Sequence, residues 1–167
     1  PAQFRARLGR IREAVDRDVL VMVDHEGGRV VRLTNGVTRF PDALTVGRTQ
    51  PPQEVERQGA VEARELKGLG IRVNLAPCVD VLVEGADPVI GTRSYGSDPL
   101  RVAAMGAARI RGLQEGGVAA CAKHFPGLGA VPKDPHRHLP TVGLDAEAMR
   151  RAHLVPFGEA IRAGAAM

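Results

Sequence analysis

The sequence has few aromatic residues and only a small excess of positive charge. It contains no Trp, one Tyr and four Phe among 167 residues, so it offers little surface on which single-stranded nucleic acids could stack. Lys and Arg number 23 against 19 Asp and Glu, a net charge of +4. The basic residues are scattered through helix-like segments, where solvated helix faces are their usual role. We therefore expect no nucleic-acid partner.

Cysteines and long apolar runs are also scarce. Cys78 and Cys121 lie far apart, each inside an apolar run, which is typical of buried free thiols and not of a disulfide framework or a paired metal motif. No apolar run reaches the roughly 18 residues that a membrane-spanning helix needs. Residues 1–10 contain no apolar core of a secretory signal. These absences predict a cytoplasmic protein without a membrane span.

Helix-like and strand-like patterns alternate along the chain. Apolar spacing and Pro/Gly boundaries predict helices over residues 4–15, from Pro51 or Pro52 to Gly68 or Gly70, from Pro99 to Gly116, from Asp145, and from Pro156. Three apolar runs without alternation, residues 19–23, 73–79 and 118–122, predict strands buried on both faces, as in a parallel sheet. The ionisable residues that directly follow these runs are Asp24, Asp80 and Lys123.

This grouping predicts an α/β fold of the (β/α)8 TIM-barrel type, in which the chemistry gathers at the C-terminal ends of the strands. A doubly wound sheet would alternate in the same way, but no GxGxxG loop follows any of the predicted strands. A whole barrel needs about 250 residues. We therefore expect residues 1–167 to form one partial barrel domain, truncated at both ends, with another strand beginning near residues 165–167.

Two segments contain side chains suited to a polar ligand. In residues 23–32, Asp24 stands at a strand end beside two glycines and two arginines. Carboxylates accept hydrogen bonds from sugar hydroxyls and Arg donates in a fixed fork, so this segment suits a polyhydroxylated ligand. A capped loop with solvated charges is the alternative. The loop of residues 87–98 has one arginine, Arg93, among small residues, and taken alone it is better explained as a structural loop.

A third segment, after the last strand-like run, is rich in titratable side chains. Lys123 and His124 stand where a buried strand ends, an unfavourable place for a charge without a partner. Asp134 and His136 are two residues apart, so the carboxylate can orient the imidazole and raise its basicity, as proton transfer requires. Asp134, His136 and His138 could instead be metal ligands, although no further ligand cluster is evident, or ordinary surface side chains.

A resemblance to a known family connects these segments. The motifs that carry it are VDHEGGRVVR, NLAPCVDV, DPVIGTRSYGSDP, KHFPGLGAVPKDPHRHLP and VPFGEAIRAGA. In this order they resemble the family 3 glycoside hydrolases. Within that family they are similar to the bacterial β-N-acetylhexosaminidases, which trim N-acetylglucosamine from cell-wall fragments. The KHFPG segment followed by an Asp-x-His loop is the feature that points away from the β-glucosidase branch.

The resemblance implies a retaining hydrolase that removes terminal non-reducing N-acetylglucosamine from a glycan, such as a peptidoglycan fragment, without a metal or organic cofactor. The residues that it assigns to sugar binding are Asp24, Arg32, Arg93, Lys123 and His124. It assigns the general acid/base role to His136, with Asp134 orienting the ring. The family's nucleophile, an Asp on a later strand, would lie beyond Met167.

Two residues depart from the pattern of the family. Leu128 stands where many relatives carry His, and Pro135 replaces a small residue in the Asp-x-His loop. Pro135 favours extended backbone at Asp134, which bears on the pairing with His136. The competing interpretation is a non-catalytic sugar-binding remnant, or an inactive fragment without its nucleophile and with exposed strand edges.

Overall fold

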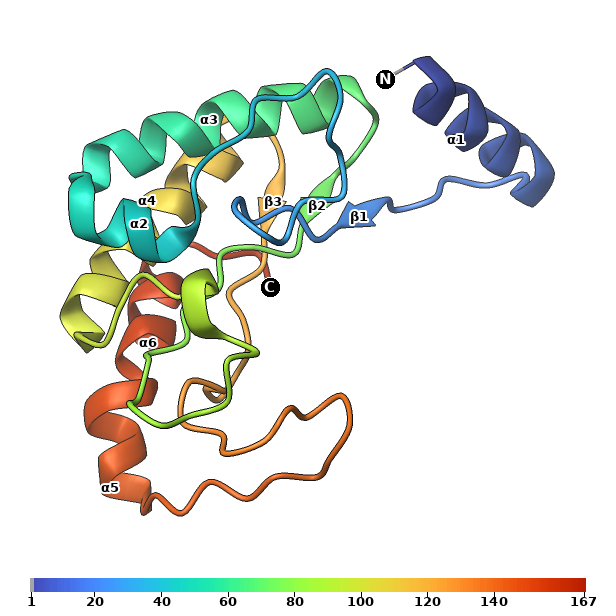
Figure 1. Cartoon of the computed structure of the whole chain (residues 1–167). Helices are drawn as coiled ribbons and strands as arrows, with labels where there is room; N and C mark the ends of the chain where they lie inside the picture. Colours follow the sequence, from blue (N-terminus) through green and yellow to red (C-terminus); the bar gives the residue numbers. More distant parts are fainter. Residues whose placement is uncertain (1) are drawn as a thin grey trace.

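The computed structural model describes residues 2–167 and contains a three-stranded parallel sheet flanked by helices (Figure 1). The strands are β1 (Met22–Val23), β2 (Val73–Asn74) and β3 (Ala119–Ala120). The helical elements are α1 (Ala2–Val15), α2 (Ala43–Thr49), α3 (Pro52–Gly68), the 3-10 turn η1 (Gly91–Arg93), α4 (Pro99–Glu115), α5 (Ala146–Ala148), the π-helical turn η2 (Met149–His153) and α6 (Val155–Arg162).

The strands lie side by side in the order in which they occur in the chain. Met22 pairs with Val73, and Val73 pairs with Ala119, both in parallel register. Met167 then hydrogen-bonds to Ala120, with 3.2 Å between its N and the Ala120 O, so the next segment enters beside β3. Sequential parallel strands joined by helices form an arc of a (β/α) barrel, as predicted. The reversal of strand order that a doubly wound sheet requires does not occur among the described strands.

The regular ladder is shorter than the apolar runs predict. Each run contributes only two residues to a strand. In the second run Pro77 has no N–H to donate, which interrupts the ladder. Pairing continues beyond it as an isolated bridge between Cys78 and Lys123, where the Val79 N lies 2.7 Å from the Lys123 O. The carboxyl ends of β2 and β3 are thereby held together by irregular backbone.

The helices agree with the expected positions, with one addition. The helices predicted over residues 4–15, from Pro51 or Pro52 to Gly68 or Gly70, and from Pro99 to Gly116 are present as α1, α3 and α4. The predicted start at Asp145 is also confirmed, because its carboxylate accepts a hydrogen bond from the Ala148 N. Helix α2 was not predicted. It begins after Asp42, whose Oδ1 accepts from the Thr45 N at 3.0 Å. Among the described residues, no helix is long and apolar enough to cross a membrane.

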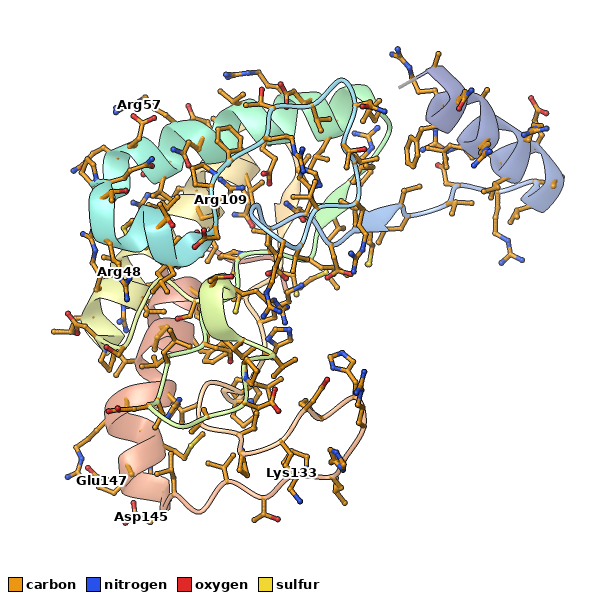
Figure 2. All side chains as sticks on the ribbon, viewed as in Figure 1. Arg48, Arg57, Arg109, Lys133, Asp145 and Glu147 are labelled. Carbon is orange, nitrogen blue, oxygen red and sulfur yellow. The ribbon has the colours of Figure 1, made fainter. Side chains whose placement is uncertain are left out.

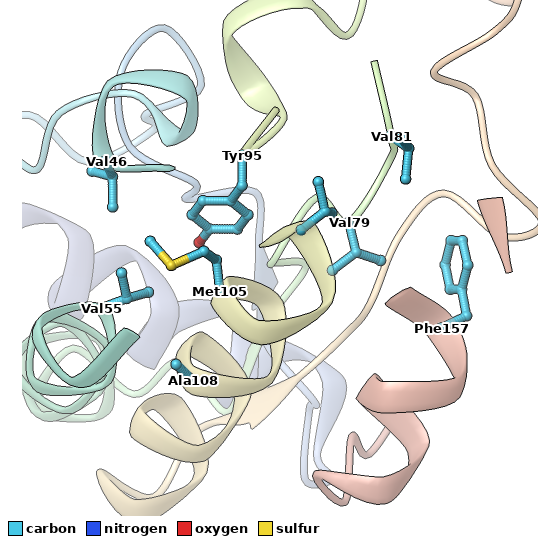
Figure 3. Packing of buried hydrophobic residues seen from close by; sticks show 9 residues of the cluster. Val46, Val55, Val79, Val81, Tyr95, Met105, Ala108 and Phe157 are labelled. Atoms are coloured by element: carbon cyan, nitrogen blue, oxygen red, sulfur yellow. The ribbon is translucent and has the colours of Figure 1, made fainter. Parts of the chain in front are cut away.

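Two apolar clusters hold the helices against the strands. The first joins α2, α3, α4 and α6 (Figure 3) and consists of Val46, Val55, Val79, Val81, Tyr95, Val102, Met105, Ala108 and Phe157. The second packs helices α3 and α4 against the strands and includes Leu66, Ile71, Ile110, Leu113, Val118 and Ala120. Both cysteines are free thiols, as expected, but only Cys78 is buried. Cys121 is half-buried because Ala120 takes the buried face and successive strand residues point to opposite faces.

Candidate active site

Charged side chains meet at the edge of the sheet where the parallel strands end. Asp24 follows β1, and Lys123 with His124 follows β3. Lys123 Nζ donates to Asp24 Oδ1 at 2.6 Å and to Glu26 Oε1 at 2.8 Å. Arg93 donates a bidentate pair to Glu26, with Nε to Oε2 at 2.9 Å and Nη2 to Oε1 at 2.8 Å. Two carboxylates and two cations therefore form one connected cluster, which we call the strand-end cluster.

The strand-end cluster is buried except at Asp24. The Glu26 side chain is 5% exposed and that of Lys123 is 13% exposed, whereas the Asp24 carboxylate is 39% exposed. Burial alone would raise the pKa of Asp24 and of Glu26. Burial is the largest single effect at each, but the hydrogen bonds from Lys123 and Arg93 and the nearby positive charges together outweigh it, so both pKa values are lowered. Both carboxylates are thus ionised at neutral pH, and Asp24 is the one that a ligand can reach.

His124 is held on both ring nitrogens. Its Nδ1 lies 2.6 Å from Asp80 Oδ2, and its Nε2 lies 3.0 Å from Arg93 Nη2. Because a guanidinium has only donors, Nε2 must accept, so the ring proton resides on Nδ1 and is donated to Asp80. His124 is therefore a neutral imidazole of fixed tautomer that joins Arg93 to Asp80.

Asp80 is the fully buried anchor of the loop that follows β3. Its Oδ1 accepts from the Leu128 N at 2.6 Å, and its Oδ2 accepts from the His124 N and from Cys78 Sγ, both at 3.2 Å. Burial would raise the pKa of Asp80, but the hydrogen bond from His124 and the other donors lower it. Since Leu128 contributes its backbone N–H, its departure from the usual His does not remove this anchor.

Two residues of this site were not assigned a role from the sequence. Asp80 carried the same signal as Asp24, an acid directly after an apolar run, but its neighbours His124 and Leu128 lie far along the chain. Glu26 stands two residues after Asp24, directly beyond a predicted strand, where alternate side chains point to the same side. That spacing was the signal that could have found it.

The two arginines of the first loop have different roles. Arg32 is exposed, and its charge helps to lower the pKa of Asp24, which places it in electrostatic reach of the cluster. Within residues 2–167 its side chain forms no hydrogen bond. Arg29 donates through Nη2 to the carbonyl oxygens of Pro88, Val89 and Ile90 at 2.7, 2.7 and 3.0 Å. Arg29 thus stabilises the loop that precedes Arg93.

Asp134 and His136 form a separate pair on the long loop between β3 and α5, where Figure 2 labels Lys133. Asp134 Oδ1 accepts from His136 Nδ1 at 2.7 Å and from the His136 backbone N at 2.9 Å. The backbone N–H and then the ring of His136 lower the pKa of Asp134. The pair forms with Pro135 between its members, and the imidazole is 75% exposed. No hydrogen bond among the described residues joins this pair to the strand-end cluster.

The side chains that are close enough to share a metal ion are held by hydrogen bonds to one another. Within residues 2–167, the one group of His, Cys, Asp or Glu whose ligand atoms lie within 4.8 Å of one another is Cys78, Asp80 and His124. His124 already carries its proton on the nitrogen that faces Asp80, and burial raises the pKa of the Cys78 thiol well above its usual value. Asp134, His136 and His138, the alternative metal ligands, do not converge into such a group.

Known proteins resemble this chain in both sequence and structure. The beta-hexosaminidase of Thiobacillus denitrificans is 40% identical over 99% of this chain and 48% of its own length. The structure of a glycoside hydrolase family 3 beta-N-acetylglucosaminidase from Paenibacillus superposes with a TM-score of 0.90 at 41% identity, covering 98% of this chain and 31% of that one. NagZ from Neisseria gonorrhoeae in complex with N-trifluoroacetyl-D-glucosamine gives a TM-score of 0.90 at 34% identity, covering 99% of this chain and 50% of that one.

The chain spans about half the length of the curated relatives that it matches. A family model described as the glycosyl hydrolase family 3 N terminal domain matches residues 4–167. By that match, this chain belongs to glycosyl hydrolase family 3.

Proposed function

We propose that this chain supplies the sugar-binding pocket and the acid/base pair of a retaining β-N-acetylhexosaminidase, which removes terminal non-reducing N-acetylglucosamine. The observation that carries the proposal is the strand-end cluster, in which ion pairs fix several donors around one exposed carboxylate, Asp24. The relatives named beta-hexosaminidase and beta-N-acetylglucosaminidase support the same reaction. The alternative, for a chain that spans about half the length of these relatives, is a sugar-binding remnant without catalytic activity.

The strand-end cluster can bind a sugar through its unused donors and acceptors. Lys123 has three N–H groups and uses one each on Asp24 and Glu26, so the third is free for a hydroxyl. Asp24 gives Lys123 one oxygen and keeps Oδ2 for sugar hydroxyls. Arg32 adds a positive charge close enough to help lower the pKa of Asp24. Held by ion pairs, these groups are preorganised for the ligand.

In the proposed mechanism, His136 moves the proton in both steps. As the carboxylate nucleophile bonds to the anomeric carbon and the glycosidic bond breaks, Nε2–H of the His136 imidazolium protonates the leaving oxygen. The neutral ring then takes a proton from the water that attacks the anomeric carbon and releases the carboxylate. Asp134 accepts the Nδ1–H throughout. Most retaining glycosidases use two carboxylates, whereas a neutral imidazole does not repel the nucleophile. We expect this nucleophile to be an Asp beyond Met167.

The proposed substrates are peptidoglycan fragments that end in N-acetylglucosamine, in the cytoplasm. This finer assignment rests on the resemblance of the KHFPG and Asp-x-His motifs. It is tested by comparing turnover of an N-acetylglucosaminyl-N-acetylmuramic acid disaccharide with that of chitobiose. Preference for chitobiose would contradict it.

His136→Ala in the full-length gene product tests the acid/base assignment. We expect hydrolysis of N-acetylglucosaminides with poor leaving groups to fall by about 100-fold or more, as loss of general acid catalysis predicts. Aryl glycosides with good leaving groups need less protonation and should lose less. The matched control is His138→Ala, an exposed histidine on the same loop. An equal loss for both kinds of leaving group would show that His136 is not the acid.

Asp24→Ala tests the sugar site independently of the chemistry. We expect weaker binding of N-acetylglucosamine in calorimetric titration, and an unchanged affinity would contradict the assignment. The isolated chain of 167 residues should not hydrolyse an aryl N-acetylglucosaminide, because its nucleophile is expected elsewhere. Turnover by the pure chain would overturn that expectation.

A further inference from the structure

A buried asparagine side chain takes over strand pairing next to the strand-end cluster. The regular ladder between β1 and β2 stops at Val23, which pairs with Asn74. Two residues later, the His25 backbone N donates to Asn74 Oδ1 at 3.1 Å, and Asn74 Nδ2 donates to the His25 O at 2.8 Å. The amide of Asn74 therefore replaces a backbone peptide and extends the pairing of β1.

This contact fixes the peptide between the two carboxylates of the site. His25 is 1% exposed and lies between Asp24 and Glu26 in the chain. When its N–H and C=O are both held, the peptides on either side of His25 cannot turn freely, and the side chains of Asp24 and Glu26 keep their directions. These directions bring Asp24 and Glu26 to the same Lys123 ammonium.

The asparagine is itself held by a buried ion pair. Its second amide hydrogen is donated to Glu62 Oε1 on α3 at 2.7 Å. The other oxygen of Glu62 is paired with Arg109 on α4, which Figure 2 labels below α3 and whose guanidinium lies 5.6 Å from the centre of the Phe40 ring. Asn74, Glu62 and Arg109 are 0%, 1% and 4% exposed. A continuous series of hydrogen bonds therefore connects helices α3 and α4 to the His25 peptide.

We propose that Asn74 and Glu62 are positioning residues for sugar binding, which set the direction of Asp24 and Glu26 through the His25 peptide. The proposal rests on the sugar-binding role of Asp24 proposed above. A buried ion pair is a weak source of stability, because apolar residues of similar volume often serve as well. An apolar pair, however, could not donate to the His25 O and accept from its N–H, which is what the site requires of this position.

The test separates positioning from folding by exchanging the two polar groups. Asn74→Ala removes the whole contact. In the double variant N74D/E62Q, the introduced glutamine can donate to the introduced carboxylate and still accept from Arg109, so the buried charges remain compensated. That carboxylate still accepts from the His25 N–H, but nothing donates to the His25 O. Val55→Ala, a buried truncation on the same helix α3, controls for loss of stability alone.

We expect Asn74→Ala in the full-length gene product to raise the KM, and the Kd of N-acetylglucosamine, by about tenfold, the scale of one lost polar contact. The kcat should change little, because a ground-state sugar contact is lost. The double variant should recover most of the melting temperature and keep a raised KM, whereas Val55→Ala should lower the melting temperature alone.

Recovery of the parental KM together with stability in the double variant would overturn the proposal. So would a rise in KM for Val55→Ala equal to that for Asn74→Ala. If Asp24→Ala also leaves the affinity for N-acetylglucosamine unchanged, then the sugar site itself is wrong. If Asp24→Ala weakens binding while N74D/E62Q binds like the parent, then only the positioning role fails.

Discussion

Asp80→Asn tests whether one buried carboxylate holds the loop that presents His124. Asp80 accepts from the Leu128 N on one oxygen and from three donors on the other, two from His124 and one from Cys78. An amide of the same shape has one oxygen and one NH2 group. Whichever way the new amide is oriented, its NH2 group would face a donor of the loop.

The orientation that costs less stability is the one in which the NH2 group faces the Leu128 N–H, because only one hydrogen bond is then lost. One hydrogen bond to a charged acceptor is then lost, which costs about 1.5–3 kcal/mol, and a buried N–H without a partner costs about 1–3 kcal/mol. The two contributions overlap, so the free energy of unfolding should fall by about 2–4 kcal/mol, less than their sum. The control is Asp98→Asn at the exposed start of α4, where Asn caps as well as Asp and the change should stay below about 0.5 kcal/mol.

Guanidinium unfolding at several pH values gives the readout. The pKa of Asp80 is lowered in the folded state, so its contribution is complete above the unfolded pKa and is lost as the pH falls through the folded pKa. The difference between parent and variant should therefore be constant above about pH 5 and shrink at lower pH. A loss below about 1 kcal/mol at pH 7, or one that does not shrink in acid, would refute the anchoring role.

Three further predictions concern the loops and the core. Lys123→Met removes the cation shared by two carboxylates, so the pKa of both should rise and affinity for N-acetylglucosamine should fall by about tenfold in calorimetric titration; an unchanged affinity would contradict the shared-cation site. Gly129→Ala should lower the free energy of unfolding by about 1–3 kcal/mol in denaturant titration, because its Cβ would overlap the Val81 carbonyl. The control is Gly143→Ala, where a Cβ meets nothing within 4 Å and the free energy of unfolding should not change. Equal losses of stability in the two variants would refute the overlap with Val81. Burial raises the pKa of Tyr95 to about 12, so this single tyrosine should show no phenolate absorbance at pH 10 while the chain is folded, and an ordinary titration there would show an accessible ring.

The sequence predicts those parts of the fold that depend on local patterns. Apolar spacing locates α1, α3 and α4, and unbroken apolar runs locate three parallel strands in the correct order. The length of the ladder depends on pairing between distant segments, and Pro77 interrupts it in a way that hydrophobicity does not show. Helix α2 is too short for a periodic signal and depends on the Asp42 cap.

The candidate site shows the same difference between residues predictable from local patterns and residues that depend on distant partners. A charge directly after a buried strand identified Asp24, Lys123 and His124, because parallel strands end at one edge of the sheet. The resemblance, not the spacing, supplied their roles. Glu26 and Asp80 were missed because their importance lies in distant partners. Arg93 is 67 residues from Glu26 in the chain, and His124 is 44 residues from Asp80.

The strand-end cluster is suited to binding and poorly suited to proton transfer. The lowered pKa values of Asp24 and Glu26 keep both carboxylates ionised near neutral pH, and the pKa of Arg93 is raised, first by its hydrogen bonds to Glu26. A general acid needs a pKa near the operating pH. A proton donor must therefore come from outside this cluster, and histidine is the side chain whose ordinary pKa fits.

Geometry distinguishes among the five histidines of the chain. His25 and His153 are buried, and burial lowers the pKa of both, so they resist protonation. His124 has one ring nitrogen bound to a carboxylate and the other blocked by a guanidinium. His138 is exposed, and no carboxylate in the described chain pairs with its ring. Among the described histidines, His136 alone combines an Nδ1 held by a carboxylate with an exposed ring, which supports its proposed role as acid and base.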